Sequence, residues 1–142
     1  GHGGNIAPLK SAIGEIHTAN NAAGAPTLAF DVANWYVLGP VARRAEALYG
    51  DREGHHATAA EIALVQHLYP DHIKDPALLE GPAGTDTTFH DARDFRRRFP
   101  DGRMGSDPGL ATPEHGADFL ALARDAVLEQ YRRLVETAAP EA

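Results

Sequence analysis

Apolar side chains recur at helical spacing in four stretches of the 142-residue chain. This spacing predicts helices over residues 7–21, 41–49 and 55–69, and a fourth helix with Thr112 as its N-cap and Pro113 as its first residue. The third stretch is apolar around much of its circumference, so we expect it to be largely buried. The apolar face of the fourth helix consists of Phe119, Ala123, Val127, Tyr131 and Leu134.

One short apolar run, residues 26–32, predicts a buried strand. It follows the glycine-rich loop at residues 1–5 and the first predicted helix. A loop, a helix and then a strand are typical of an α/β sheet, and we therefore expect an α/β fold. Residues 71–108 are instead rich in Gly, Pro and Asp. A segment of that length without regular structure is usually functional or covered by a partner.

Composition narrows the classes of function. The length suits one domain with a real core, and the formal net charge of −7 argues against a protein that binds duplex nucleic acid through its phosphates. The only basic cluster, residues 96–98, is flanked by aspartates, so a solvated or salt-bridged surface is the better interpretation. Cysteine is absent, and the sequence has neither a secretory signal nor a membrane-spanning run. We expect a cytoplasmic protein that binds neither nucleic acid nor membrane.

The segment Gly1-His2-Gly3-Gly4-Asn5 carries the first candidate chemistry. Glycines let the backbone turn sharply and approach a ligand closely, and an imidazole among them is uncrowded enough to reach a metal. The alternative is a terminal remnant of cloning. The helix predicted directly after this loop weakens that alternative without excluding it.

His56 and Glu61 form the second candidate site, because histidine and glutamate build hydrolytic metal sites and move protons. Residues five apart on a regular helix point about 140° away from each other. The two side chains therefore converge only if His56 precedes the helix and Glu61 lies in its first turn, as an N-cap at Thr58 would arrange. The same pattern, Thr58-x-x-Glu61, also predicts a capping box in which the carboxylate serves only the backbone.

Two further features have both a functional and a structural interpretation. Residues 101–108 contain two glycines and an Asp-Pro pair, which describe a shaped turn before the last helix. This turn either lines a site or is purely structural. Trp35 follows the predicted strand and either faces a substrate or belongs to the core.

Three segments, in this order, resemble the creatininase family of metal-dependent hydrolases. Residues 1–5 are similar to the family's HGGN loop. His56-Ala57, Glu61 and residues 64–70 are similar to its His-Ala…Glu-Thr-Ser…Pro stretch. Residues 105–116 resemble its Gly-x-x-Asp-Pro…Ala-Thr-x-Glu-x-Gly segment. Two hydroxyls of the family pattern are replaced by Ile62 and Ala63, which leaves the substrate class open.

The resemblance implies a three-layer α/β/α fold with a mostly parallel sheet, often assembled as hexamers. It implies two divalent metal ions (zinc, manganese or iron) that activate water against a C–N amide or cyclic amide bond of a small molecule. His2 would be a metal ligand, and Glu61 a metal ligand or proton-handling carboxylate. His56 would polarise the substrate or stabilise the tetrahedral intermediate. Trp35 and Asn5 would contact the substrate.

In the family, three further ligands precede the HGGN loop. We therefore expect residues 1–142 to be the C-terminal part of a single creatininase-like domain. Such a chain would be active as an amidohydrolase once its N-terminal half is supplied, and would form homo-oligomers. The alternative is a non-catalytic fragment or a binding or scaffolding domain that keeps the fold without a complete metal site.

Overall fold

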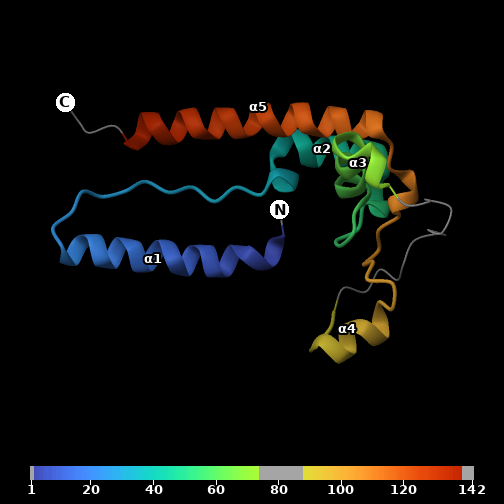
Figure 1. The fold of residues 1–142 in the computed structure, drawn as a ribbon, viewed down its shortest axis with the longest axis horizontal. Coiled ribbons are helices and arrows are strands. Elements are labelled where there is room, and N and C mark those ends of the chain that lie inside the picture. The colour runs from blue at the N-terminus through green and yellow to red at the C-terminus, as the bar shows by residue number, and fades with distance from the viewer. Residues whose placement is uncertain (1, 74–87, 139–142) are drawn as a thin grey trace.

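The structure is a computed structural model that describes residues 2–73 and 88–138. All its regular elements within those ranges are helical (Figure 1). The α-helices are α1 (Ile6–Ala22), α2 (Gly39–Tyr49), α3 (Ala59–Leu68), α4 (Ala92–Arg98) and α5 (Pro113–Ala138). Short 3-10 turns, η1 (Gly3–Asn5) and η2 (Trp35–Val37), precede α1 and α2. The helices predicted over residues 7–21 and 41–49 and from Thr112 onward are confirmed.

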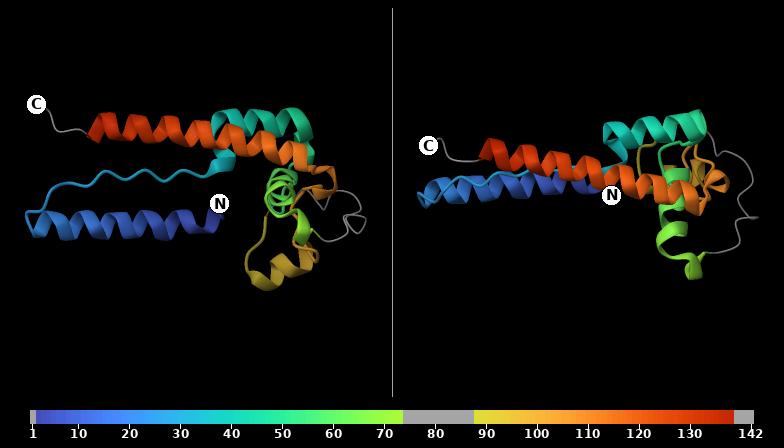
Figure 2. Two further views of the ribbon diagram at one scale, coloured as in Figure 1. Left: turned by 45° about the horizontal axis from the view of Figure 1, so that its top comes forward. Right: turned by 90° about the horizontal axis from the view of Figure 1, so that it is seen from above.

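The prediction of an α/β/α fold with a parallel sheet is wrong, because no strand forms in the described part of the chain. Residues 26–32 are extended as predicted, but no neighbouring strand there satisfies their backbone groups. The side chains of residues 26–31 are exposed too, with Leu28 at 48% and Phe30 at 39%. The segment returns alongside α1 (Figures 1 and 2), where the Phe30 ring lies 5.4 Å from that of His17.

The hydrophobic core lies where α2, α3 and the first half of α5 meet. Val41 and Phe119 are completely buried there. Helices α3 and α5 approach so closely that a Cβ atom on Gly116 would lie 2.0 Å from the carbonyl oxygen of Ala63. Small residues therefore set the distance between these helices, and the core is built around that contact.

Helix α3 is shorter and less buried than its apolar sequence predicts. It begins at Ala59 rather than at residue 55. Its buried apolar side chains are the alanines, while Val65 and Leu68 are exposed. The uniform apolarity of this stretch thus indicates a helix correctly but overestimates its burial, because only one face meets α5.

Helix α1 and the second half of α5 project from the core with exposed apolar side chains (Figure 1). No residue of α1 is buried. On the predicted apolar face of α5, Phe119 is buried, but Val127 and Tyr131 are 44% and 60% exposed. Within the described residues, every helix is too short or too polar to cross a membrane.

Helix α4 carries the basic cluster and is a surface element. Asp91 caps its first turn by accepting hydrogen bonds from the backbone N–H groups of Arg93 and Asp94. Asp94 in turn pairs with Arg97 and, at 3.0 Å, with Arg98. These contacts support the salt-bridged interpretation of residues 96–98.

Tyr49 makes the stability of the fold depend on pH under alkaline conditions. Its hydroxyl oxygen lies 2.9 Å from Nδ1 of His115, and burial, with a smaller contribution from the Glu53 charge, raises the pKa of Tyr49 to about 12. The phenol ionises more readily in the unfolded chain, so its stabilising contribution is complete below pH 10 and is lost as the pH rises through about 12. We expect the free energy of unfolding to fall by about 3 kcal/mol over that window.

Urea unfolding at a series of pH values from neutral to strongly alkaline measures this fall. Tyr49→Phe should flatten the decline, whereas Tyr131→Phe, at an exposed position, should leave it unchanged. An equally steep decline in Tyr49→Phe would assign the effect to other groups.

Candidate functional site

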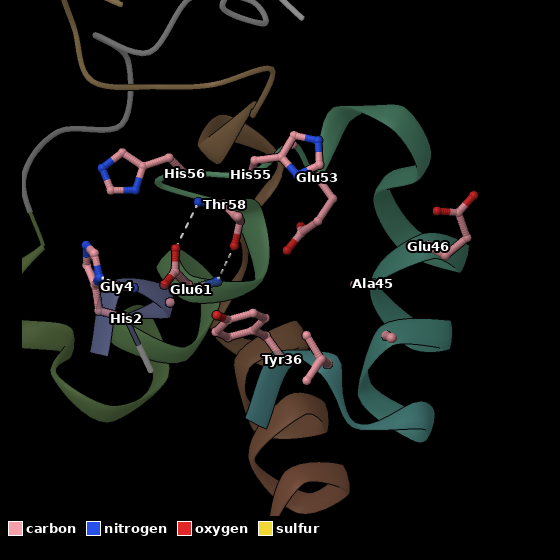
Figure 3. Close-up of a pocket in the computed structure, with 14 residues that line it drawn as sticks. His2, Gly4, Tyr36, Ala45, Glu46, Glu53, His55, His56, Thr58 and Glu61 are labelled. Atoms are coloured by element: carbon pink, nitrogen blue, oxygen red, sulfur yellow. Dashed lines mark hydrogen bonds between the residues drawn. The ribbon is translucent and has the colours of Figure 1, made fainter. Parts of the chain in front are cut away.

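A pocket of about 490 Å³ lies between η1, η2, α2 and the N-terminal end of α3 (Figure 3). Neither lysine nor arginine is among the described residues that line it, so its walls are acidic and imidazole-rich. The titratable residues that line it, apart from Tyr36, are His2, His55, His56, Glu46, Glu53 and Glu61. The pocket thus brings His2 together with His56 and Glu61, which lie more than 50 residues further along the chain, and all three were predicted as site residues.

The start of α3 explains how His56 and Glu61 come to share this pocket. Thr58 is the N-cap, with its Oγ1 accepting a hydrogen bond from the Glu61 N–H at 3.1 Å. The Glu61 carboxylate accepts one from the Thr58 N–H at 3.3 Å. The predicted capping box is therefore confirmed. It also places His56 before the helix and Glu61 in its first turn, which is the arrangement that convergence requires.

His2 is held by its own loop. Its Nδ1 accepts a hydrogen bond from the Gly4 N–H at 2.9 Å, and a Cβ on Gly4 would lie 2.9 Å from the imidazole. The His2 ring is edge-on to that of His56, with 6.3 Å between centroids. Because Nδ1 is the acceptor, the proton of the neutral ring sits on Nε2. Binding a metal through either nitrogen of the neutral ring would therefore release the Gly4 N–H, because Nδ1 would carry either the proton or the metal.

Glu53 is a pocket residue that the sequence did not reveal. Burial raises the pKa of the Glu53 carboxyl, although hydrogen bonds from Thr58 and Ala60 oppose the shift and the charge of Glu61 adds to it. Its Oε2 accepts the Ala60 N–H at 3.1 Å. Two carboxylates, Glu53 and Glu61, thus serve the same helix end. No periodicity or motif marks Glu53, since only the tertiary fold buries it.

The two predicted substrate contacts, Trp35 and Asn5, do not line the pocket. Tyr36, which the sequence analysis did not single out, does. Trp35 packs against the core, 6.4 Å from the Phe119 ring, and Asn5 lies in η1 outside the set of pocket-lining residues. Tyr36 lines the pocket, and its hydroxyl accepts a hydrogen bond from Asn34 Nδ2 at 3.0 Å. The sequence signal that could have identified Tyr36 was its position beside Trp35, shortly after the predicted strand.

Comparison with protein families matches residues 1–131 to creatininase, described as creatinine amidohydrolase. The chain belongs to the creatininase family. No curated protein matches it significantly. Membership supports an amidohydrolase-type enzyme and, because creatininases are generally metal-dependent, raises the question of whether this pocket holds a metal.

The creatininase pocket does not present a complete metal site. In residues 2–73 and 88–138, no three His, Cys, Asp or Glu side chains are grouped so that they could hold a metal ion. Catalytic zinc sites usually take three protein ligands. His2 and Glu61 have the right chemistry, but each is engaged with backbone N–H groups. The side chains that the structure describes therefore do not by themselves complete a site for the metal that the family implies.

Proposed function

We propose that this creatininase-family chain forms part of a metal-dependent hydrolase that cleaves a C–N amide or cyclic amide bond of a small molecule. The observation that carries the proposal is the convergence of His2, His56 and Glu61 in one acidic pocket. In this role the Glu61 carboxylate accepts and returns a proton. The His56 imidazole stabilises charge on the substrate carbonyl.

The proposal includes a partner. Among the described residues, His2 and Glu61 are two donors of the required chemistry, and in this proposal a further polypeptide region that packs beside the pocket supplies the remaining metal ligands. The exposed apolar side chains of α1 and α5 favour such packing, since large apolar surfaces usually mark contact sites. Assembly into a homo-oligomer is part of the same proposal.

Metal analysis tests this proposal. The protein is isolated from its own cells without chelators, with any polypeptide that accompanies it, and its zinc, manganese and iron are measured. Hydrolysis of creatinine and of a panel of linear and cyclic amides is assayed in parallel. We expect bound divalent metal, and we expect His2→Ala to weaken metal binding more than about 10-fold, since even outer-shell partners contribute that much. His72→Ala, at an exposed histidine that does not line the pocket, is the matched control.

A non-catalytic binding or scaffolding role is the second candidate, and the incomplete donor set favours it. It predicts that His56→Ala and Glu61→Gln leave the protein's function untouched. An assembly that contains no metal and hydrolyses none of the amides would select this role over the enzyme.

A further inference from the structure

The segment at residues 104–107 lies directly behind the His56 loop, although it contributes nothing to the pocket lining. Ser106 is 0% exposed, and its Oγ donates a hydrogen bond of 2.6 Å to the backbone carbonyl of His56. A buried hydroxyl bound to the backbone of a pocket residue fixes that residue's position without touching a ligand.

Two further backbone hydrogen bonds join the same segments. The His55 N–H donates to the Met104 carbonyl at 2.9 Å, and the Asp107 N–H donates to the Arg52 carbonyl at 2.8 Å. The side chains of Arg52 and Asp107 also form an ion pair. These contacts flank Ser106 on its own segment, and on the other segment they fix residues 52 and 55 ahead of His56, so residues 52–56 are attached to 104–107 at several points.

The backbone on both sides of His56 is shaped for this attachment. Gly54 has φ +67°, and a Cβ there would lie 2.3 Å from the Ser106 nitrogen, so only glycine permits the approach. Ala57 has φ +51°, a left-handed conformation that costs a non-glycine residue energy. Strain of this kind persists only where surrounding contacts impose it, and it gathers at functional sites.

We propose that Ser106 is a positioning residue for His56. Through the His56 carbonyl it holds the loop so that the imidazole faces His2 and Glu61 across the pocket. The part of this role that concerns catalysis rests on the proposed hydrolase function, whereas the positioning of the ring does not. The sequence predicts this Gly-Ser-Asp-Pro segment as a turn before a helix. The proposal adds a positioning role for its serine.

Replacement of the serine tests the proposal in the full 142-residue chain. Ser106→Ala should shift or broaden the ¹H–¹³C NMR signals of the His56 imidazole. In the active assembly it should lower kcat about 10- to 100-fold with KM within a factor of two, because small misplacements of a reacting group have effects of this size. The control is Ser11→Ala. Ser11 is the chain's other serine and lies on the exposed helix α1, so its replacement should change neither the His56 NMR signals nor kcat.

Ser106→Cys separates hydrogen bonding from packing, since a thiol fills similar space but donates weakly. It should give intermediate values, and it serves as the test if Ser106→Ala does not fold. Unchanged His56 signals in the folded variant, with only a lower melting temperature, would make Ser106 purely structural and overturn the proposal. Absence of hydrolysis in the unsubstituted protein would count against the proposed function alone, because the NMR measurement needs no substrate.

Discussion

Glu61→Gln should lower kcat/KM for amide hydrolysis by about 100-fold or more while leaving the fold intact. A proton-handling carboxylate typically contributes that much, and the neutral amide cannot take its place. The helix cap should survive, because glutamine also serves at this position of a capping box. The measurement pairs amide hydrolysis in the metal-containing assembly with thermal unfolding.

Thr58→Ala is the complementary change. It removes the hydroxyl that accepts the Glu61 N–H, so it should cost about 1 kcal/mol of stability. The backbone N–H that holds the Glu61 carboxylate remains, and kcat should change only a few-fold. If Glu61→Gln keeps full activity and Thr58→Ala causes the larger loss, Glu61 is a cap and nothing more.

The helices were predictable because their signals are local. Thr112 is confirmed as the cap of α5, since its Oγ1 accepts the His115 N–H at 3.2 Å. Thr58 caps α3 in the same way. The predicted start of α3 at residue 55 was too early, because Ala57 takes a left-handed conformation that no helical turn accommodates. The cap pattern placed this boundary better than the apolar periodicity did.

The sheet was not predictable from the chain in the same way. A strand is defined by its neighbour, and residues 26–32 have the composition and extended backbone of a strand without any strand beside them in the described structure. Burial likewise depends on the neighbouring elements. Tyr131 and Phe119 share one predicted face, but only Phe119 meets α2 and α3. Periodicity identifies an apolar face but not what covers it.

The candidate site was predicted in part. His56 and Glu61 share a pocket because a cap that the sequence shows determines where α3 begins, and η1 brings His2 to the same pocket. Glu53 and Ser106 were missed because their roles depend on segments about 50 residues away or on burial within the fold. Contacts of that separation leave no pattern in a single sequence.

Gly116→Ala should be among the most destabilising single changes in the core, although alanine normally stabilises a helix interior relative to glycine. The added Cβ would lie 2.0 Å from the Ala63 carbonyl oxygen and 2.7 Å from the His67 Cβ. Backbone cannot yield as a flexible side chain does, so α5 would have to move away from α3. Overpacking of this kind typically costs about 1–3 kcal/mol, and a clash with backbone lies toward the upper end of that range.

Urea unfolding followed by the fluorescence of Trp35 measures this effect, because the only tryptophan lies 6.4 Å from the buried Phe119 ring. Gly14→Ala in α1 is the matched control, since nothing lies within 4 Å of its added Cβ. That variant should increase helicity by circular dichroism, with a gain of about 1 kcal/mol in local helix stability. A Gly116→Ala protein as stable as the unsubstituted chain would contradict the close α3–α5 contact on which the core depends.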